Sequence, residues 1–207
     1  MTRTAITLGA AALAAAGTID TAHAQKPKGA EPVVAPATWN IDVVHSELSF
    51  RVRHLTGRVR GHFTDWTGTV VTDPASLTQG STTVEVKTAS ISTENADRDK
   101  HLRSADFFDV ENYPTLTFKS GKVELKGTDL TLYGDLTIRG VTKPVVLKGS
   151  YNGVANDPWG NQRIAFEATT TFNRKDFGLA WGKMVEGVAL VGDEVTIDLA
   201  IEAIRQK

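Results

Sequence analysis

The amino-acid sequence predicts an all-β protein, an eight-stranded antiparallel barrel with a short helical insertion between its third and fourth strands. Apolar residues recur at every second position in segment after segment, as at Leu48, Phe50 and Val52. Successive side chains of a strand point to opposite faces, so each such segment has one apolar and one polar face. About eight such segments follow one another along the chain. Closure into a barrel removes their exposed edges and places the apolar faces inside.

The first 24 residues have the layout of a secretory signal peptide. Arg3 gives a positively charged start, residues 5–16 form a short apolar run, and Ala22-His23-Ala24 supplies small residues before Gln25. The apolar run is shorter than the roughly 20 residues that a membrane span needs. We therefore expect cleavage after Ala24, export, and no integral membrane span.

The rest of the chain divides into a leader and one domain. Residues 25–37 contain Pro27, Pro32 and Pro36 among small and charged residues, which predicts a flexible leader. Residues 38–207 are predicted to form the barrel domain. After a first apolar signal at 39–42, we expect strands at about 47–55, 58–71, 82–91, 115–125, 130–138, 144–151, 163–172 and 194–204.

Local patterns justify several of these bounds. In 58–71 the apolar residues stand at odd positions up to Phe63 and at even positions from Trp66, which predicts a bulge or bend near Asp65. The segment 126–129, Lys-Gly-Thr-Asp, is typical of a hairpin turn between the fourth and fifth strands. The segment 156–160, Asn-Asp-Pro-Trp-Gly, predicts a loop before the seventh strand.

The segment 95–112 does not alternate and is predicted to be the helical insertion. Asn95 can cap a helix N-terminus, and acidic residues come early and basic residues late, which complements the helix dipole. We expect one or two helical turns that cover one barrel end through Leu102, Phe107 and Phe108. Arg98 and Asp99 could pair beneath this cover.

Composition excludes several classes of function. The chain holds 23 Lys and Arg against 24 Asp and Glu, a net charge of −1, and the predicted signal peptide removes one of each sign. A near-neutral chain without basic runs gives no indication of nucleic-acid or anionic-lipid binding. The chain has no cysteine, which excludes thiolate metal sites and thiol catalysis.

No metal site or catalytic residue is expected. The four histidines after the predicted cleavage site, none of them spaced as a pair of metal ligands, are His45, His54, His62 and His101. His54 and His62 could still face each other across a turn. Asp42, His45 and Ser46 are the residue types of a hydrolytic triad, but neighbours on an extended segment point to opposite faces, and GxSxG is missing. We expect Asp42 and His45 to satisfy backbone groups instead.

Several motifs stand in order between Trp39 and Ile204. They are Trp39-x-Ile41-Asp42-x-x-His45-Ser46-x-Leu48-x-Phe50-x-Val52-x-His54-Leu55, Gly61-x-Phe63, Ser90-Ile91-x-Thr93, Arg98-Asp99-x-His101-Leu102-x-Ser104-x-Asp106-Phe107-Phe108, Pro114-x-x-x-Phe118-x-Ser120, Gly134-x-Leu136-Thr137-Ile138-x-Gly140-Val141-Thr142-Lys143-Pro144 and Arg174-x-Asp176-Phe177-Gly178. With these motifs the chain resembles the YceI-like lipid/polyisoprenoid-binding family.

The resemblance implies an elongated, lipocalin-like barrel whose apolar pore holds a long isoprenoid, of the polyprenyl or isoprenoid-quinone type, or a similar amphiphilic lipid. It also implies a bacterial periplasmic protein, which agrees with the signal peptide. That lipid or quinone is the expected partner, and no cofactor is expected beyond it. Nucleic acid is not an expected partner, and a homodimer stays open.

The inward positions of the predicted strands are the candidate ligand contacts. They are Phe50, Val52, Phe63, Val84, Val86, Leu116, Phe118, Leu132, Leu136, Leu147, Phe166 and Phe172. Polar residues expected near one mouth, which could meet a lipid headgroup, are His45, Arg98, His101 and Arg174. We expect Phe177 and Gly178 to form a packing turn beside Arg174.

Burial of hydrocarbon would drive binding. Each five-carbon isoprene unit offers at most about 4 kcal/mol, at about 0.8 kcal/mol for each CH2 group. Association costs about 4–15 kcal/mol, so a chain of several units is needed. Two alternatives remain open, because alternation does not distinguish a hollow barrel from a filled one. They are a periplasmic enzyme acting on a lipidic substrate in the same cavity, and a non-binding, stress-related structural protein.

Overall fold

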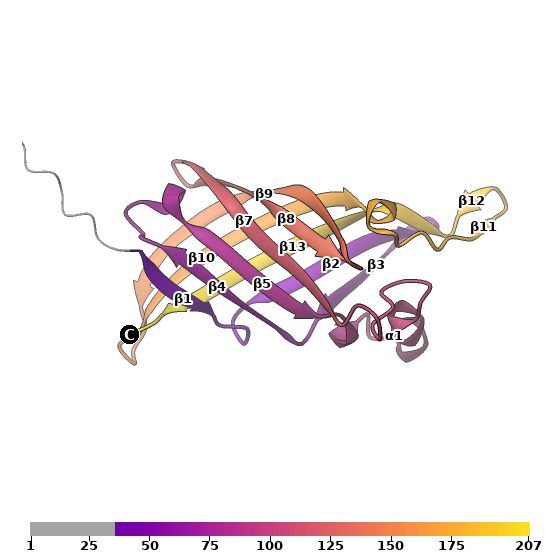
Figure 1. Ribbon diagram of the computed structural model, residues 1–207, viewed down its shortest axis with the longest axis horizontal. Coiled ribbons are helices and arrows are strands. Elements are labelled where there is room, and N and C mark those ends of the chain that lie inside the picture. The colour runs from indigo at the N-terminus through magenta and orange to yellow at the C-terminus, as the bar shows by residue number, and fades with distance from the viewer. Residues whose placement is uncertain (1–35) are drawn as a thin grey trace, which may run out of the picture. The chain divides into compact units, whose positions relative to one another are not determined.

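Residues 36–207 of the computed structural model form a closed antiparallel β-barrel with a single α-helix in that range (Figure 1). The predicted signal peptide, and the predicted leader up to residue 35, lie outside the described residues. The strands are β1 (Ala37–Ile41), β2 (Glu47–His54), β3 (Gly57–Phe63), β4 (Trp66–Thr72), β5 (Ser81–Lys87), β6 (Ile91–Ser92), β7 (Thr115–Lys126), β8 (Asp129–Ile138), β9 (Val141–Asn156), β10 (Gln162–Asn173), β11 (Met184–Val185), β12 (Val188–Ala189) and β13 (Val191–Arg205).

Eight positions around the ring account for the long strands. β1 and β2 both pair with β13, so together they occupy one position. β3 and β4 share the next position, β5 and β6 the one after, and β7, β8, β9, β10 and β13 complete the ring. β1 also pairs with β4, which closes the barrel. This confirms the predicted eight-stranded antiparallel barrel.

The bend predicted near Asp65 is present, but it splits the expected strand 58–71 into two. β3 pairs with β2 and β6, whereas β4 pairs with β1 and β5, and Thr64 and Asp65 belong to neither strand. The change in apolar parity reflects this change of partners. Residues 39–41, which carry the first apolar signal, belong to β1, and Ala37 already pairs with Thr72. Ala37, the last residue of the predicted leader, is thus part of the barrel wall in the structure.

The expected strand 144–151 is longer in the structure, where β9 covers Val141–Asn156. Proline lacks a backbone donor and is confined to strand edges. Pro144 pairs with Asp135 of β8, whereas the ladder between β9 and β10 reaches only Lys148, so the other side of Pro144 carries no ladder bond. Proline therefore does not mark the start of this strand.

The end of the barrel where β1 closes the ring is filled by a compact apolar cluster. Trp39, Ile164 and Ala203 are completely buried there and pack with Val70 and Leu77. The indole of Trp39 donates a hydrogen bond of 3.2 Å to the Thr72 carbonyl oxygen. We call these five side chains the closed-end cluster.

The helical insertion is confirmed between β6 and β7. The helix α1 spans Ala96–Arg103, and the Arg98 amide donates to the side chain of Asn95 at 3.0 Å, as expected for an N-cap. The helix lies at the end of the barrel away from the C-terminus (Figure 1). The downstream Phe107 is buried and packs into the core. Within residues 36–207, no helix has the length and apolar character needed to cross a membrane.

Arg98 and Asp99 do not form the pair suggested by the sequence. The buried Asp99 carboxylate accepts hydrogen bonds from the amide and the hydroxyl of Thr93. Arg98 donates from Nε to the Thr93 hydroxyl oxygen at 2.8 Å and from Nη2 to the Thr93 carbonyl oxygen at 2.9 Å. Both side chains thus fix the start of α1 to the end of β6 through Thr93.

Replacement of Trp39 by alanine should lower the free energy of unfolding by about 3–5 kcal/mol, because it empties a fully buried site. Urea unfolding followed by circular dichroism measures this change. The matched control is Trp159→Ala in the loop between β9 and β10, where the side chain is 78% exposed and the effect should stay within about 0.5 kcal/mol. Equal effects of the two changes would contradict a stabilising closed-end cluster.

Candidate functional site: an apolar cavity inside the barrel

A cavity of about 540 Å³ lies inside the barrel, and most of its lining residues are aliphatic or aromatic. Protein interiors normally pack closely, with few voids larger than a water molecule. This volume falls within the roughly 300–1,000 Å³ of small-molecule pockets. At about 30 Å³ for each water-sized group, it has room for about 18 such groups. The cavity therefore has the size and the chemistry for a hydrocarbon chain.

All twelve predicted lining residues border this cavity, namely Phe50, Val52, Phe63, Val84, Val86, Leu116, Phe118, Leu132, Leu136, Leu147, Phe166 and Phe172. Several inward side chains, such as Phe50, Phe118 and Leu132, are only half-buried. They face the lumen, so this exposure reflects the void beside them. Their contact with a ligand stays a prediction.

Two glycines help to keep the lumen open. The ring of Phe50 lies against Gly61, the residue opposite it on β3, where a Cβ atom would collide with the ring. On the far wall, a Cβ atom at Gly134 of β8 would come within 2.6 Å of the Phe118 ring. Each ring therefore packs flat against the wall, where any larger residue at the glycine would displace it. Alternation predicts the two phenylalanines as lining residues, but it gives no sign of this role of the glycines.

Aromatic side chains from two distant segments meet at the end of the cavity near α1. Trp181, which follows the 3-10 turn Arg174–Phe177, packs edge-on against His101 of α1, with ring centroids 4.9 Å apart. Phe107 lies 5.1 Å from His101 and 5.2 Å from Trp181, measured between ring centroids. All three line the cavity, and we call them the mouth cluster. Trp181 was missed because its segment has no strand or helix periodicity.

Arg174 holds the backbone of the barrel wall in place beside the mouth cluster. Its side chain is almost completely buried, and its guanidinium donates to the carbonyl oxygens of Gly192, Leu179 and Trp181 and to Asp193 Oδ1. Burial lowers the pKa of Arg174, and the Asp193 carboxylate opposes that shift. These bonds occupy the guanidinium of Arg174. Although Arg174 lines the cavity, its donors are therefore directed at the backbone and not at a lipid headgroup.

The predicted packing turn next to Arg174 is present. Phe177 is buried, and Gly178 adopts a left-handed conformation with φ of 76° that suits glycine. Arg98 and His101 also line the cavity, on its α1 side. His101 Nε2 lies 2.8 Å from Asp106 Oδ2, which orients the imidazole against Trp181. Headgroup binding by Arg98 and His101 stays a prediction.

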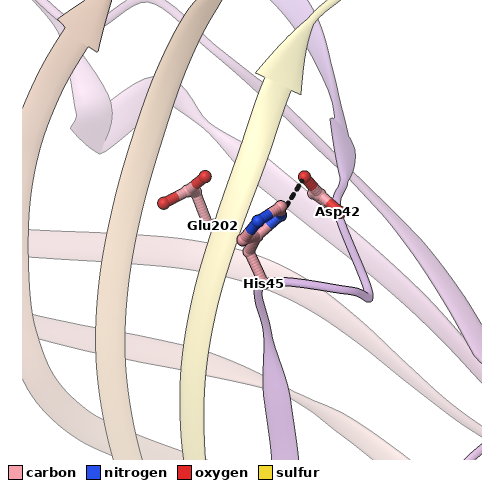
Figure 2. Close-up of side chains that lie close together, drawn as sticks. All are labelled: Asp42, His45 and Glu202. Carbon is pink, nitrogen blue, oxygen red and sulfur yellow. Dashed lines mark hydrogen bonds and ion pairs between the residues drawn. The ribbon is translucent and has the colours of Figure 1, made fainter. Parts of the chain in front are cut away.

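His45 is not at the mouth where we expected it. It lies on the outer wall at the bend between β1 and β2, its side chain is 60% exposed, and it does not line the cavity. Figure 2 shows its ring pointing toward Asp42, with Nδ1 2.8 Å from Asp42 Oδ2. The bend turns residues 42–46 away from the lumen, so the predicted headgroup contact of His45 is corrected to an outer-wall contact.

Asp42, His45 and Glu202 offer ligand atoms within 4.8 Å of one another, a spacing that a metal ion could use (Figure 2). Arg163 already supplies positive charge there, however. Its Nη1 lies 2.9 Å from Asp42 Oδ2 and also bonds Glu202, while its Nε lies 3.0 Å from Asp157 Oδ2. A metal ion would have to displace the guanidinium from its partners. The group is therefore best described as an ion-pair network that joins the bend after β1 to β10 and β13.

The neighbouring Ser46 is likewise a structural residue. Its hydroxyl donates to the Glu202 carbonyl oxygen at 3.2 Å and accepts from the Glu202 amide at 2.9 Å. These bonds fix the start of β2 to β13 and do not involve His45. As expected, Asp42 satisfies a nearby backbone group by accepting from the Val44 amide at 3.2 Å. The two other strand histidines lie on opposite faces, because His54 lines the cavity and His62 lies on the outer face, so they do not face each other.

The ion-pair network alters the acidity of two carboxyl groups. Burial alone would raise the pKa of Asp42, but hydrogen bonds from Arg163, His45 and the Val44 amide lower it overall. Asp157 follows the same pattern, since bonds from Asn161, Arg163 and the Trp159 amide outweigh burial and hold its pKa far below the usual range.

Comparison with known proteins identifies one family. The sequence profile of the YceI-like domain matches residues 39–203. A relative in Pseudomonas syringae pv. syringae, named UPF0312 protein, is 40% identical over 167 residues, which cover 79% of this chain and 83% of the relative.

Two solved structures have a similar fold. BcnA of Burkholderia cenocepacia gives a TM-score of 0.68 at 25% identity and covers 79% of this chain and 99% of its own. A polyisoprenoid binding domain from Saccharophagus degradans, implicated in plant cell wall breakdown, gives a TM-score of 0.63 at 15% identity, over 83% of this chain and 99% of its own. At that identity, the second likeness concerns the fold alone.

Replacement of Arg163 by glutamine should destabilise the protein at neutral pH, and this loss should shrink in acid. The folded-state pKa values of Asp42 and Asp157 are lowered, so their stabilisation by Arg163 is present above about pH 4 and is lost as the pH falls through the lowered values. Urea unfolding of both proteins between pH 7 and about pH 2 measures the difference.

The control is Arg205→Gln, since Arg205 is exposed and bonds only the neutral side chain of Gln162 among its side-chain partners in residues 36–207. A difference between wild type and Arg163→Gln that does not change with pH would contradict the role assigned to the carboxyl groups.

Proposed function

The chain belongs to the YceI-like domain family, and we propose that it binds a long-chain isoprenoid lipid in the barrel cavity and sequesters or carries it. The lipid is of the polyprenyl or isoprenoid-quinone type or a similar amphiphile. The observation that carries this proposal is the apolar lumen of about 540 Å³, whose inward side chains do not fill it. A filled core would leave no room for a ligand.

The size of the cavity favours a long chain over a short one. Hydrocarbon that fills about 18 water-sized positions gains up to about 14 kcal/mol at roughly 0.8 kcal/mol for each CH2 group. Association costs about 4–15 kcal/mol. A chain that fills the cavity can therefore offset the cost of binding over most of that range, whereas a terpene of two isoprene units, at about 8 kcal/mol, offsets it only over the lower part.

The lining favours a carrier over an enzyme. Between the mouth and the closed end, the polar side chains that line the lumen are hydroxyl groups such as those of Thr82 and Thr170. Hydrolysis or isomerisation of a lipid needs a positioned acid or base at the reacting atoms. The charged and titratable lining residues, by contrast, gather toward the mouth, where they suit a headgroup. The polyisoprenoid binding domain from Saccharophagus degradans, which has a similar fold, supports the same class of ligand.

We further propose that the mature protein works in the periplasm. The basis is the layout of residues 1–24, with Arg3, a short apolar run and small residues before Gln25. Residues 38–207 then act after export as a single barrel domain. An isoprenoid lipid has very little solubility in water, so a water-filled compartment between membranes is a place where such a carrier is useful.

Replacement of Ala168 by tryptophan should block the lumen. Ala168 lines the cavity from β10, and an indole there takes the room of several methylene groups, so affinity should fall at least about tenfold. Mass spectrometry of an organic extract of the gently purified protein measures the bound lipid. The matched control is Glu167→Trp, the exposed neighbour on the same strand, which should retain the wild-type lipid content.

Two outcomes of that extraction would contradict the carrier, and a third would contradict the role assigned to Ala168. A wild-type extract without lipid favours a filled or non-binding barrel. A product-like lipid fragment favours the enzyme alternative. Equal lipid content in wild type and Ala168→Trp, with both folded, removes β10 from the binding cavity.

Replacement of Trp181 by alanine should open the mouth. It removes two aromatic contacts, with His101 and Phe107, each worth about 0.5–1.5 kcal/mol. The rate at which a fluorescent long-chain fatty acid leaves the barrel should rise at least about fivefold. Stopped-flow fluorescence measures this rate, with the exposed Trp159→Ala as control. An unchanged rate would mean that the mouth cluster does not limit exchange.

A further inference from the structure

Four arginines stand together on the outer face of the hairpin formed by β2 and β3. Arg51 is opposite Arg60 and Arg53 is opposite Arg58 in the ladder, and we call these four residues the arginine ladder. The alternate residues of the two strands, including Phe50, line the cavity. Like charges directly opposite one another on a sheet destabilise it. The arrangement therefore calls for a negatively charged partner.

The protein itself supplies part of that negative charge, because Glu47, Glu94 and Asp198 line the same outer pocket as Arg51 and Arg60. Arg51 lies 2.6 Å from Asp198 of β13, between Nη1 and Oδ2. Arg53 donates to the carbonyl oxygens of Leu55 and Ala189. Arg58 and Arg60 are exposed, and among residues 36–207 they form no hydrogen bond or ion pair through their side chains. Two guanidinium groups are thus available to an outside partner.

An exposed apolar surface lies beside the arginine ladder. The hairpin of β11 and β12 extends past the end of the barrel (Figure 1). Its side chains Met184, Val185 and Val188 are 63%, 39% and 47% exposed, and we call these three residues the hairpin tip. Exposed apolar groups gathered in one place commonly mark an interaction site. Glu186 of the connecting turn and the preceding Lys183 bring opposite charges to this hairpin.

Hydrogen bonds connect these two surfaces. Arg53 Nη1 donates to the Ala189 carbonyl oxygen at 3.3 Å, and the Leu55 amide donates to the Leu190 carbonyl oxygen at 3.0 Å. His54 pairs with Val191 in the ladder between β2 and β13. The base of the hairpin that carries the tip is therefore bonded directly to the Arg53 end of the arginine ladder.

The hairpin is also close in sequence to residues of the cavity wall. Trp181 precedes the hairpin tip in sequence, Leu190 and Val191 follow it, and all three line the lumen. The hairpin that carries the exposed tip is thus flanked on both sides in sequence by residues of the cavity wall.

From these observations we propose that the arginine ladder and the hairpin tip dock the barrel onto an anionic lipid bilayer. The hairpin tip enters the boundary between headgroups and acyl chains, and the arginines contact phosphate groups. Anionic headgroups supply the negatively charged partners that Arg58 and Arg60 lack within residues 36–207. Acyl chains cover the exposed side chains of Met184, Val185 and Val188. This docking is a property of the outer face, so it goes beyond the proposed binding of a lipid inside the barrel.

Vesicle sedimentation tests the electrostatic half of the proposal. The mature protein is mixed with vesicles of phosphatidylcholine alone, or of equal parts phosphatidylcholine and phosphatidylglycerol, at low ionic strength. We expect binding to the anionic vesicles that weakens as salt is added. The double change Arg58→Gln and Arg60→Gln should lower the partition coefficient about 25-fold, because each basic residue near the surface contributes about fivefold.

The matched control removes the same charge elsewhere. Lys126→Gln with Lys148→Gln changes two exposed lysines on β7 and β9 that form no ion pair within the described part of the chain. This variant should bind anionic vesicles as the wild type does. An equal loss of vesicle binding in both double variants would show that only the net charge of the protein matters. That result would overturn the proposal that the arginine ladder is the docking surface.

A second variant tests the hairpin tip. Val185→Gln with Val188→Gln changes two exposed side chains without adding charge, so the fold should persist, and circular dichroism checks this. Binding to the anionic vesicles should fall at least about tenfold, because insertion is lost. No binding of the wild type to anionic vesicles, or undiminished binding of both surface variants, overturns the proposal, and capture of a protein partner by the same face would then take its place.

The lipid content of each purified variant separates this proposal from the proposed function. Surface variants that keep their extracted lipid but no longer sediment with vesicles support docking as a distinct property. A wild type that sediments with anionic vesicles but yields no lipid supports docking and contradicts only the carrier.

Discussion

Closure of the strand ring is the constraint on which the rest of the structure depends. β1 pairs with β4 on one side and with β13 on the other, so backbone hydrogen bonds hold the wall in a closed circle. A closed ring keeps its walls apart without side chains that meet along the axis. It can therefore contain a void that an open sheet would have to fill. The lost packing inside is offset at the two ends, where the closed-end cluster and the core around Phe107 and Phe177 are densely buried.

The sequence was sufficient to predict which residues face the lumen, because alternation is a local property of a strand. It was not sufficient to predict that the lumen is hollow. The hollow lumen depends on which residues lie beside the inward rings, as Gly61 lies beside Phe50 and Gly134 beside Phe118. Those neighbours are set by the register between strands, which alternation within one strand does not reveal. Trp181 and the hairpin of β11 and β12 were missed for a related reason, since irregular segments have no period to detect.

Charged residues were recognised more easily than their roles. His45 and Arg174 both looked available for a headgroup, but the fold places each of them against other partners. Arg174 donates to the carbonyl oxygens of Leu179, Trp181 and Gly192, and the bend after β1 places His45 outside the barrel beside Asp42. Arg163 lies 121 residues from Asp42, a separation that no spacing rule bridges. Side-chain type narrows the chemistry of a site, and only the fold decides which partners are in reach.

The same limit explains why a near-neutral chain without basic runs can still have a basic face. In sequence, the four residues of the arginine ladder are separated by apolar residues and a turn, and they stand together only because β2 pairs with β3. The alternation that sends Phe50 and Val52 into the lumen sends Arg51 and Arg53 to the outside. One strand thus contributes to two surfaces with different chemistry. Because the two sets of side chains never share a face, the outer surface can change its affinity for a membrane while the lumen keeps its affinity for a lipid.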